Sequence, residues 1–431
     1  RSFRRGGADL DDAGREELSG IDTRLAELST RFGRNLMVST AGHAVLVTDE
    51  ARLAGLGEDR KEQLRADAAA EGREGWLIRL GLPSVQPILE ELADAGLRQE
   101  IAAASRARGT DGDGDNRGIV LETVRLRARR AELLGFDSHA DFVVAEETAR
   151  TVAAVDGLLG TVTPAAVDNA RGEYKRALDL AHVSGEQVGD LSEADWPYWA
   201  GRLRAEDLAV DTAELKKYFP LSRVLRDGGF FAAERLYGIR VTPREDLVGY
   251  HPDVRVWEVL DAGDNGGGSI GLLLTDYYAR PTKRGGAWMS SFVDQNNLLG
   301  QTPVVVNVLN IARPADGEEA LLSLDEVTTL FHEFGHGLHG LLSDVRYPSL
   351  SGTNVPRDFV EFPSQINENW ALEPEVLANY ALHVDTGAPL PPETAAAVTA
   401  EAQWGQGFAT TEYLAACHVD LAWHRLSAGE A

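Results

Sequence analysis

The sequence His-Glu-Phe-Gly-His at residues 332–336 constrains this chain more than any other feature. On a helix, His332 and His336 are one turn apart on the same face, so both imidazoles can reach one metal ion. Glu333 follows the first histidine and is placed to act on a water bound to that ion. A carboxylate from another helix would complete the two-histidine, one-glutamate set of a catalytic zinc site whose fourth position is open to water. The pattern predicts a zinc peptidase.

The residues around this motif predict a helix. Ser323 and Glu326 form a capping box, in which the serine hydroxyl accepts from the amide of Glu326 and the carboxylate reaches back. Apolar residues then recur at helical spacing and predict one buried stripe: Val327, Phe331, Phe334, Leu338 and Leu341. At about 100° per residue, His332, His336 and His339 fall on the roughly opposite face. For His339 we predict packing or hydrogen bonding.

A second helix is predicted to supply the carboxylate, from Glu361. Asn354 and Pro356 suit a helix start, and Pro363 removes one helical hydrogen bond, which predicts a bend near Glu361. The apolar face, which we predict to be buried, carries Phe359, Phe362, Ile366 and Trp370. The polar face carries Arg357, Glu361, Gln365 and Glu368. Two helices with such opposed polar faces predict one shared metal centre.

Two further carboxylates are candidates for orienting the histidines. Metal-bound imidazoles usually donate their other N–H to an acceptor, and Asp358 and Glu368 are near enough in sequence to serve. The competing interpretation for each is an ordinary carboxylate on a helix face. The sequence alone leaves both interpretations open.

Composition excludes several classes of function. The net charge of −26 argues against a surface for nucleic-acid phosphates, so no nucleic-acid partner is expected. No apolar run approaches the roughly 20 residues needed to span a bilayer, so no membrane partner is expected. The single cysteine, Cys417, rules out an intramolecular disulfide and fits a reducing cytosol, which favours a cytoplasmic location. We expect Cys417 to be a small core residue.

Most of the chain is predicted to be helical, with a small sheet in its middle. Helices are expected over 9–37, 119–135 and 140–183, the last with breaks near Gly160 and Pro164. Residues 254–260 and 270–277 predict a β-hairpin, and 304–309 could add a third strand. These patterns divide the chain into a helical region (1–236), a β-sheet region (237–312) and a region of metal helices (313–431). An exposed sheet edge could add a peptide as another strand.

An acidic segment offers one alternative metal site. Asp111, Asp113, Asp115 and Glu122 occupy positions 1, 3, 5 and 12 of a calcium-binding loop. Asn116, however, stands where the sharp turn requires a glycine. We therefore favour a solvated acidic connector.

Three segments resemble one family of enzymes. They read Phe-His-Glu-Phe-Gly-His-Gly-Leu-His-Gly (331–340), Ser-Gly-Thr-Asn-Val-Pro-Arg-Asp-Phe-Val-Glu-Phe-Pro-Ser-Gln (351–365) and Gly-Ala-Trp-Met-Ser (286–290). They are similar to the peptidyl-dipeptidase, oligopeptidase A and thimet oligopeptidase family of zinc metallopeptidases, most of all to its bacterial peptidyl-dipeptidase branch. The resemblance extends over the whole chain. It implies a mainly α, multi-helix zincin-type fold, with a deep channel and a small β-sheet next to the zinc helix.

The resemblance also implies roles for individual residues. By position, His332, His336 and Glu361 correspond to the ligands of one zinc ion per chain, and Glu333 to the general base. It favours a substrate-binding role for Gly352 and Thr353 in the loop between the two helices and for Arg357 directly after that loop. For Arg357 the alternative is an ion pair with Glu361, one turn away.

The implied function is hydrolysis of short unstructured peptides by a monomer, with release of C-terminal dipeptides. An endo-acting oligopeptidase on the same fold is the alternative. In this family a C-terminal segment supplies a histidine and tyrosines that contact substrate, and the chain stops at Ala431 before such a segment. We therefore interpret the chain as an internal fragment of a longer protein. A zinc- and peptide-binding protein without turnover is a second alternative.

Overall fold

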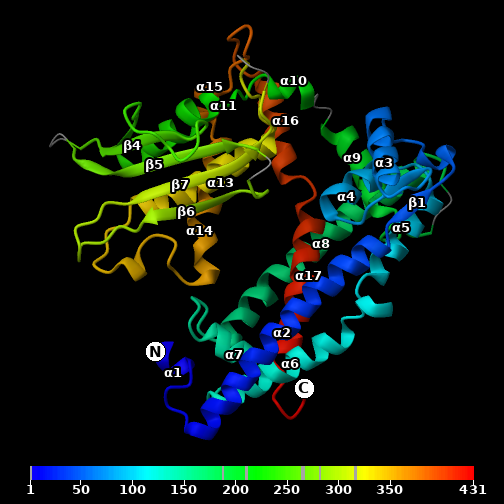
Figure 1. The fold of residues 1–431 in the computed structure, drawn as a ribbon. Coiled ribbons are helices and arrows are strands. Elements are labelled where there is room, and N and C mark those ends of the chain that lie inside the picture. The colour runs from blue at the N-terminus through cyan, green and yellow to red at the C-terminus, as the bar shows by residue number, and fades with distance from the viewer. Residues whose placement is uncertain (1, 187–188, 209–211, 264–266, 281–282, 315–317) are drawn as a thin grey trace. The chain divides into compact units, whose positions relative to one another are not determined.

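The computed structural model describes residues 2–186, 189–208, 212–263, 267–280, 283–314 and 318–431, and it is mainly α with a small sheet, as predicted (Figure 1). Its contacts divide the chain into two compact units, one of residues 1–209 with 403–431 and one of residues 210–402. This division differs from the three regions expected from sequence. Residues 221–237 pack with the sheet and with the helix of residues 324–341, and residues 406–424 pack on an earlier helix.

The first unit is built mainly from helices of different lengths. They are α1 (Ser2–Arg5), α2 (Asp12–Gly42), α3 (Glu58–Ala70), α4 (Leu82–Glu91), α5 (Ala95–Ala107), α6 (Arg117–Leu133), α7 (His139–Val144), α8 (Val152–Val183), α9 (Trp196–Leu208) and α17 (Gln406–His424). The strands β1 (Val45–Val47) and β2 (Trp76–Ile78) form an antiparallel pair beside them. Helices α8 and α17 lie side by side (Figure 1). A Cβ on Gly407 would lie 2.6 Å from the amide of Ala170, so this glycine permits their close approach.

Two of the three predicted helical segments of this unit are confirmed as α2 and α6, and the third is corrected. The expected breaks near Gly160 and Pro164 are wrong, because α8 runs through both residues. The chain leaves the helix earlier, between α7 and α8, where Arg150 has a φ of 64° and the Thr151 hydroxyl accepts from the amide of Ala154. An internal proline removes one helical hydrogen bond, a loss that packing against α17 can offset.

The acidic segment does not gather its carboxylates around one point. Asp115 is bound by Arg117, and Glu122 is bound by Arg24 at 2.6 Å. Asp111 lies 3.3 Å from a ring nitrogen of His43. These partners favour the acidic connector over the calcium loop.

The second unit contains the sheet and the helices around it. The helices are α10 (Thr212–Lys216), α11 (Leu221–Arg223), the π-helical η3 (Val224–Phe230), α12 (Phe231–Tyr237), α13 (Leu324–Leu341), α14 (Arg357–Glu368), α15 (Pro374–Tyr380) and α16 (Pro392–Gln403). The strands are β3 (Ile239–Pro243), β4 (Arg255–Asp261), β5 (Ser269–Tyr278), β6 (Trp288–Val293) and β7 (Val304–Ile311). Their order is β3-β4-β5-β7-β6, and every neighbouring pair is antiparallel except β5 and β7.

The strand predictions are largely confirmed. β4 and β5 form the expected hairpin, with Val256 opposite Leu274, and β7 adds beside β5. The loop between β4 and β5 lies partly outside the described residues, at 264–266. Strands β3 and β6 were not predicted. β6 ends the strand order among the described residues and alternates exposed with half-buried side chains, so it has no continuous apolar run.

Helix α13 packs against β5, β6 and β7 (Figure 1). The predicted stripe is confirmed, because all five of its residues are buried: Val327, Phe331, Phe334, Leu338 and Leu341. The capping box is also confirmed, with the Glu326 amide donating to Ser323 Oγ and the Ser323 amide donating to Glu326 Oε2 at 2.7 Å. Among the described residues, no helix has the length and apolar character needed to cross a membrane.

Buried His139 predicts that the stability of the first unit depends on pH. The ring lies 4.9 Å from that of His424, and burial, together with this ring and nearby arginines, lowers the pKa of His139 to about 3. An unfolded histidine titrates near 6.5, so stability is full above that pH and is lost as the pH falls toward 3. For His139→Gln, urea unfolding between pH 6.5 and 4 should depend less steeply on pH, by at most about 1.4 kcal/mol per pH unit.

Exposed His418 provides the matched control for this measurement. His418→Gln should retain the slope of the unmodified chain. An equal slope in the His139→Gln variant would show that this buried ring does not cause the acid sensitivity.

Candidate metal centre

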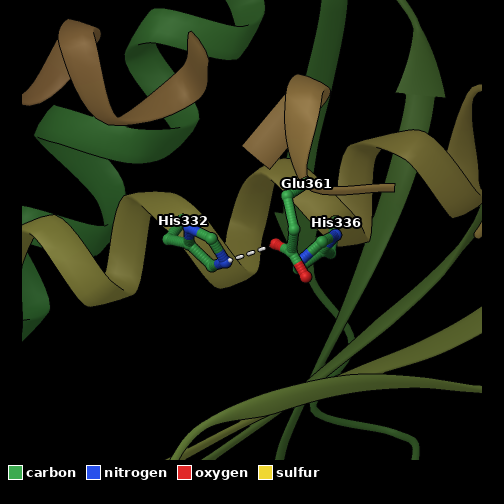
Figure 2. A group of neighbouring side chains, drawn as sticks. All are labelled: His332, His336 and Glu361. Atoms are coloured by element: carbon green, nitrogen blue, oxygen red, sulfur yellow. Dashed lines mark hydrogen bonds and ion pairs between the residues drawn. The ribbon is translucent and has the colours of Figure 1, made fainter. Parts of the chain in front are cut away.

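Two helices bring the three predicted metal ligands to one point. His332 and His336 project from α13, and Glu361 projects toward them from α14 (Figure 2). Their ligand atoms all lie within 4.8 Å of one another. Oε2 of Glu361 is 3.2 Å from Nε2 of His332 and 3.1 Å from Nε2 of His336. Both imidazoles therefore face the same carboxylate oxygen.

These separations suit one small metal ion. Zinc bonds of 2.0–2.2 Å in tetrahedral geometry place neighbouring ligand atoms about 3.4 Å apart. Two imidazole nitrogens and one carboxylate oxygen form a donor set that zinc takes in catalytic sites. The Glu361 side chain is 52% exposed while both rings are largely covered, so the cluster is open on the glutamate side. The residues fit zinc with one accessible coordination position.

Glu368 fixes the orientation of one imidazole. Its Oε1 lies 2.6 Å from Nδ1 of His332, which leaves Nε2 pointing toward Glu361. The hydrogen bond to Glu368 raises the pKa of His332. An acceptor of this kind sets the tautomer that a metal-binding histidine needs. Of the two predicted orienting carboxylates, Glu368 contacts His332, and Asp358 is exposed in the first turn of α14.

Glu333 lies beside the cluster and is buried. Its Oε2 has no hydrogen-bond partner among the described residues. Burial raises the pKa of Glu333 to about 7, with the positive charge of His332 opposing this shift and the negative charge of Glu361 adding to it. A carboxyl group that titrates near neutral pH can both accept and return a proton there. The group is therefore suited to acid–base chemistry next to a metal.

Burial favours the neutral form of the other two histidines of α13. Burial lowers the pKa of His336 and of His339. Metal binding requires the unprotonated ring, so this shift favours His336 as a ligand. The His339 ring lies 6.4 Å from that of Phe359, and His339 is outside the cluster of ligand atoms, as predicted.

The loop between the two helices packs on the end of α13. Gly352 has a φ of 52°, and its amide donates to Ser343 Oγ at 2.7 Å. A Cβ on Gly352 would lie 2.9 Å from the Cα of Gly340, so only glycine fits this approach. Thr353 is half-buried and Arg357 is exposed, and no ion pair joins Arg357 to Glu361 among the described residues. The substrate-binding role of Gly352, Thr353 and Arg357 remains a prediction.

The buried face of α14 differs from the predicted one. Phe359, Phe362 and Ile366 are exposed, whereas the buried residues of this helix are Ser364 and Asn367. The reason is the close approach of α14 to α13. A Cβ on Gly335 would lie 2.7 Å from the Cα of Ser364, which leaves no room for an aromatic side chain between the helices. Trp370, the last residue of the predicted stripe, packs against the core of the unit.

Sequence patterns did not identify two buried asparagines of this region, Asn307 and Asn367. Both donate to backbone carbonyls of α13. A signal for Asn307 was present, because a polar residue interrupts an otherwise apolar strand over 304–309. For Asn367 no comparable signal existed, since it lies on the polar side of an amphipathic pattern.

The comparisons with known proteins all point to the same family for this chain. The sequence pattern of Peptidase family M3 matches residues 88–431. The chain is 41% identical to the dipeptidyl carboxypeptidase of Escherichia coli (strain K12), over 99% of this chain and 62% of the relative. It is 37% identical to oligopeptidase A of the same organism, over 91% and 58%. With the thimet-like oligopeptidase of Dictyostelium discoideum the identity is 28%, over 88% and 56%. The chain thus spans about three fifths of the length of these relatives.

Proposed function

This chain belongs to peptidase family M3, and on that premise we propose that it is a zinc-dependent peptidase that releases C-terminal dipeptides from short peptides. The observation that carries the proposal is the convergence of two imidazole Nε2 atoms on one Glu361 oxygen, beside the buried carboxyl of Glu333. The similarity to a dipeptidyl carboxypeptidase supports the dipeptide product.

His332, His336 and Glu361 would hold the zinc ion. When bound, zinc would polarise the scissile carbonyl and lower the pKa of a water molecule from near 16 toward about 7. Glu333 accepts the proton of the attacking water and delivers it to the leaving amine. Because Glu333 is buried and its Oε2 has no protein partner among the described residues, that oxygen is available for this transfer. Glu368 keeps His332 in the tautomer that presents Nε2.

The terminal strand β6 is the proposed site for the peptide backbone. It packs on α13, where a Cβ on Gly340 would lie 2.7 Å from Cε of Met289. Gly340 is one turn beyond His336, so the sheet edge runs close to the metal ligands. An extended peptide that paired with this edge would gain backbone hydrogen bonds without a sequence requirement. Gly352 and Thr353 in the adjoining loop, and Arg357 at the start of α14, are proposed to contact the same peptide.

Two alternatives concern the reaction. The 37% identity to oligopeptidase A favours an endo-acting peptidase as the second candidate. A zinc- and peptide-binding protein without turnover is the third candidate. For each we propose a monomer in the cytoplasm that takes short unstructured peptides, consistent with a single cysteine and a net charge of −26.

Product analysis of a blocked decapeptide separates these possibilities. The chain is loaded with one equivalent of zinc, incubated with an N-terminally acetylated decapeptide, and the products are identified by mass spectrometry. Successive loss of two residues from the C-terminus is expected, with no cleavage after chelation and recovery on adding zinc.

Each alternative has its own outcome in this assay. Internal cleavage, also of a C-terminally amidated peptide, would favour the oligopeptidase. Bound zinc and bound peptide without any product would favour the binding protein. A chain that retained no zinc would contradict all three.

A further inference from the structure

Helix α13 is held from two sides by buried asparagines. On one side, Nδ2 of Asn367 on α14 donates to the carbonyl oxygen of Phe331 at 2.6 Å. On the other side, Nδ2 of Asn307 on β7 donates to the carbonyl oxygen of Glu333. The exposed fraction is 5% for Asn367 and 0% for Asn307. The two carbonyls belong to the residues directly before and after His332.

Each asparagine lies against a glycine of α13. In an α-helix the carbonyls of Phe331 and Glu333 also accept from the amides four residues later, which belong to Gly335 and Gly337. A Cβ on Gly335 would lie 2.8 Å from Cβ of Asn367, and a Cβ on Gly337 would lie 2.7 Å from Oδ1 of Asn307. Two glycines within one turn weaken a helix, so their presence requires a compensating contact. The asparagines provide that contact.

The bond from Asn367 sets the register between the two metal helices. Asn367 binds Phe331, and the next residue, Glu368, binds His332, the next residue of α13. About two turns before Glu368 on α14, Glu361 meets both imidazoles. A shift of one residue along a helix is about 1.5 Å, close to half of the 3.1 Å that separates Glu361 from the nearer ring. A shift of α14 along α13 by one residue would therefore move Glu361 away from the two imidazole rings.

Asn307 holds α13 from the side of the sheet. Its neighbours on β7 on the same face of the sheet, Val305 and Leu309, are buried apolar residues. Burying an amide in such surroundings is costly unless it is hydrogen-bonded, and Asn307 directs its Nδ2 to α13. Asn307 therefore links the central sheet directly to the peptide unit of the proposed base.

We propose that Asn307 and Asn367 are positioning residues of the metal centre. Together they fix the position and rotation of α13 between the sheet and α14, so that His332, His336 and Glu361 share one ion and Glu333 faces it. This inference rests on the proposed function, because it requires a metal at this point. A merely structural role would stabilise the fold without affecting the geometry of the bound ion.

Cobalt substitution tests this inference, because the visible spectrum of bound Co²⁺ reports its coordination geometry. Asn307→Leu and Asn367→Leu keep the side-chain volume and remove the donor. Their controls are Asn369→Leu and Asn379→Leu, since these exposed asparagines donate to carbonyls outside α13, those of Ile366 and Asp227. Each protein is loaded with Co²⁺, zinc affinity is measured by chelator competition, and kcat and KM are measured with a quenched peptide.

Both test variants are expected to show shifted cobalt bands. Zinc affinity should fall about 10- to 100-fold, as when an outer partner of a ligand is lost, with a lower kcat and an unchanged KM. Gly335→Ala, whose added Cβ would displace Asn367, should reproduce the spectrum of Asn367→Leu and serves as the second variant if a leucine variant does not fold. Both controls should keep the native spectrum.

Two results would overturn the inference in different ways. Native cobalt spectra and native zinc affinity in the test variants, with only a lower melting temperature, would leave the asparagines a purely structural role. Failure of the unmodified chain to bind Co²⁺ would overturn the proposed function, and this inference with it.

Discussion

Glu333→Gln is expected to lower kcat for peptide hydrolysis by about 10²- to 10⁴-fold, the range that general acid–base catalysis contributes. The amide has nearly the same shape as the carboxylate but cannot accept a proton from water. Glu333 is not one of the three residues whose ligand atoms converge, so the variant should retain one zinc ion per chain. The measurement combines steady-state hydrolysis of a quenched peptide with zinc analysis of the dialysed protein.

The dependence of kcat/KM on pH provides a second test of the role of Glu333. Burial raises the pKa of Glu333, and a protonated carboxyl cannot act as a base. The kcat/KM of the unmodified chain should therefore fall as the pH drops through the pKa of Glu333. The residual activity of Glu333→Gln should lack this acidic limb.

Asp325→Asn is the matched control, because Asp325 is an exposed carboxylate in the first turn of the same helix. It should leave both kcat and the pH profile unchanged. Near-normal activity of Glu333→Gln would show that another group accepts the proton.

Glu361→Gln is expected to weaken zinc binding by more than about 100-fold. It removes the charge that faces both Nε2 atoms, whereas loss of an outer partner alone costs about 10- to 100-fold in affinity. Glu368→Gln should therefore show the smaller effect, since Glu368 contacts His332 on the nitrogen that faces away from the cluster. Competition with a chelator of known zinc affinity measures both variants.

Exposed Glu375 on α15 provides the control for this series, because it pairs with Arg235 rather than with a histidine. Glu375→Gln should bind zinc like the unmodified chain. If Glu361→Gln and Glu375→Gln bound zinc equally well, Glu361 could not be a ligand.

Sequence patterns predict the buried face of α13 correctly and that of α14 incorrectly, and this difference has a physical cause. The stripe from Val327 to Leu341 is buried as predicted because a broad apolar face packs against the sheet. In α14 the larger apolar residues are exposed, because Gly335 allows a helix–helix contact too close for them and places Ser364 and Asn367 there. The spacing of apolar residues therefore shows where the apolar face of a helix lies. Whether that face is buried depends on which neighbouring element packs against the helix, and the spacing does not show this.

In the sheet and in the candidate site, too, local sequence patterns predict some features and miss those that depend on packing. The buried strands β5 and β7 have apolar runs that sequence reasoning finds, while the terminal strand β6 alternates weakly and was missed. The metal motif predicted His332 and His336 because their spacing is local to one helix. The pairing of Glu368 with His332 could only be a candidate beforehand, since it depends on the register between two helices.

Anomalous X-ray scattering from crystals of the zinc-loaded chain tests the central claim most directly. Data collected on either side of the zinc absorption edge should give one strong difference peak, bonded to Nε2 of His332, Nε2 of His336 and a carboxylate oxygen of Glu361. Zinc bound elsewhere in the chain, or a peak that lacks Glu361 among its ligands, would contradict the account.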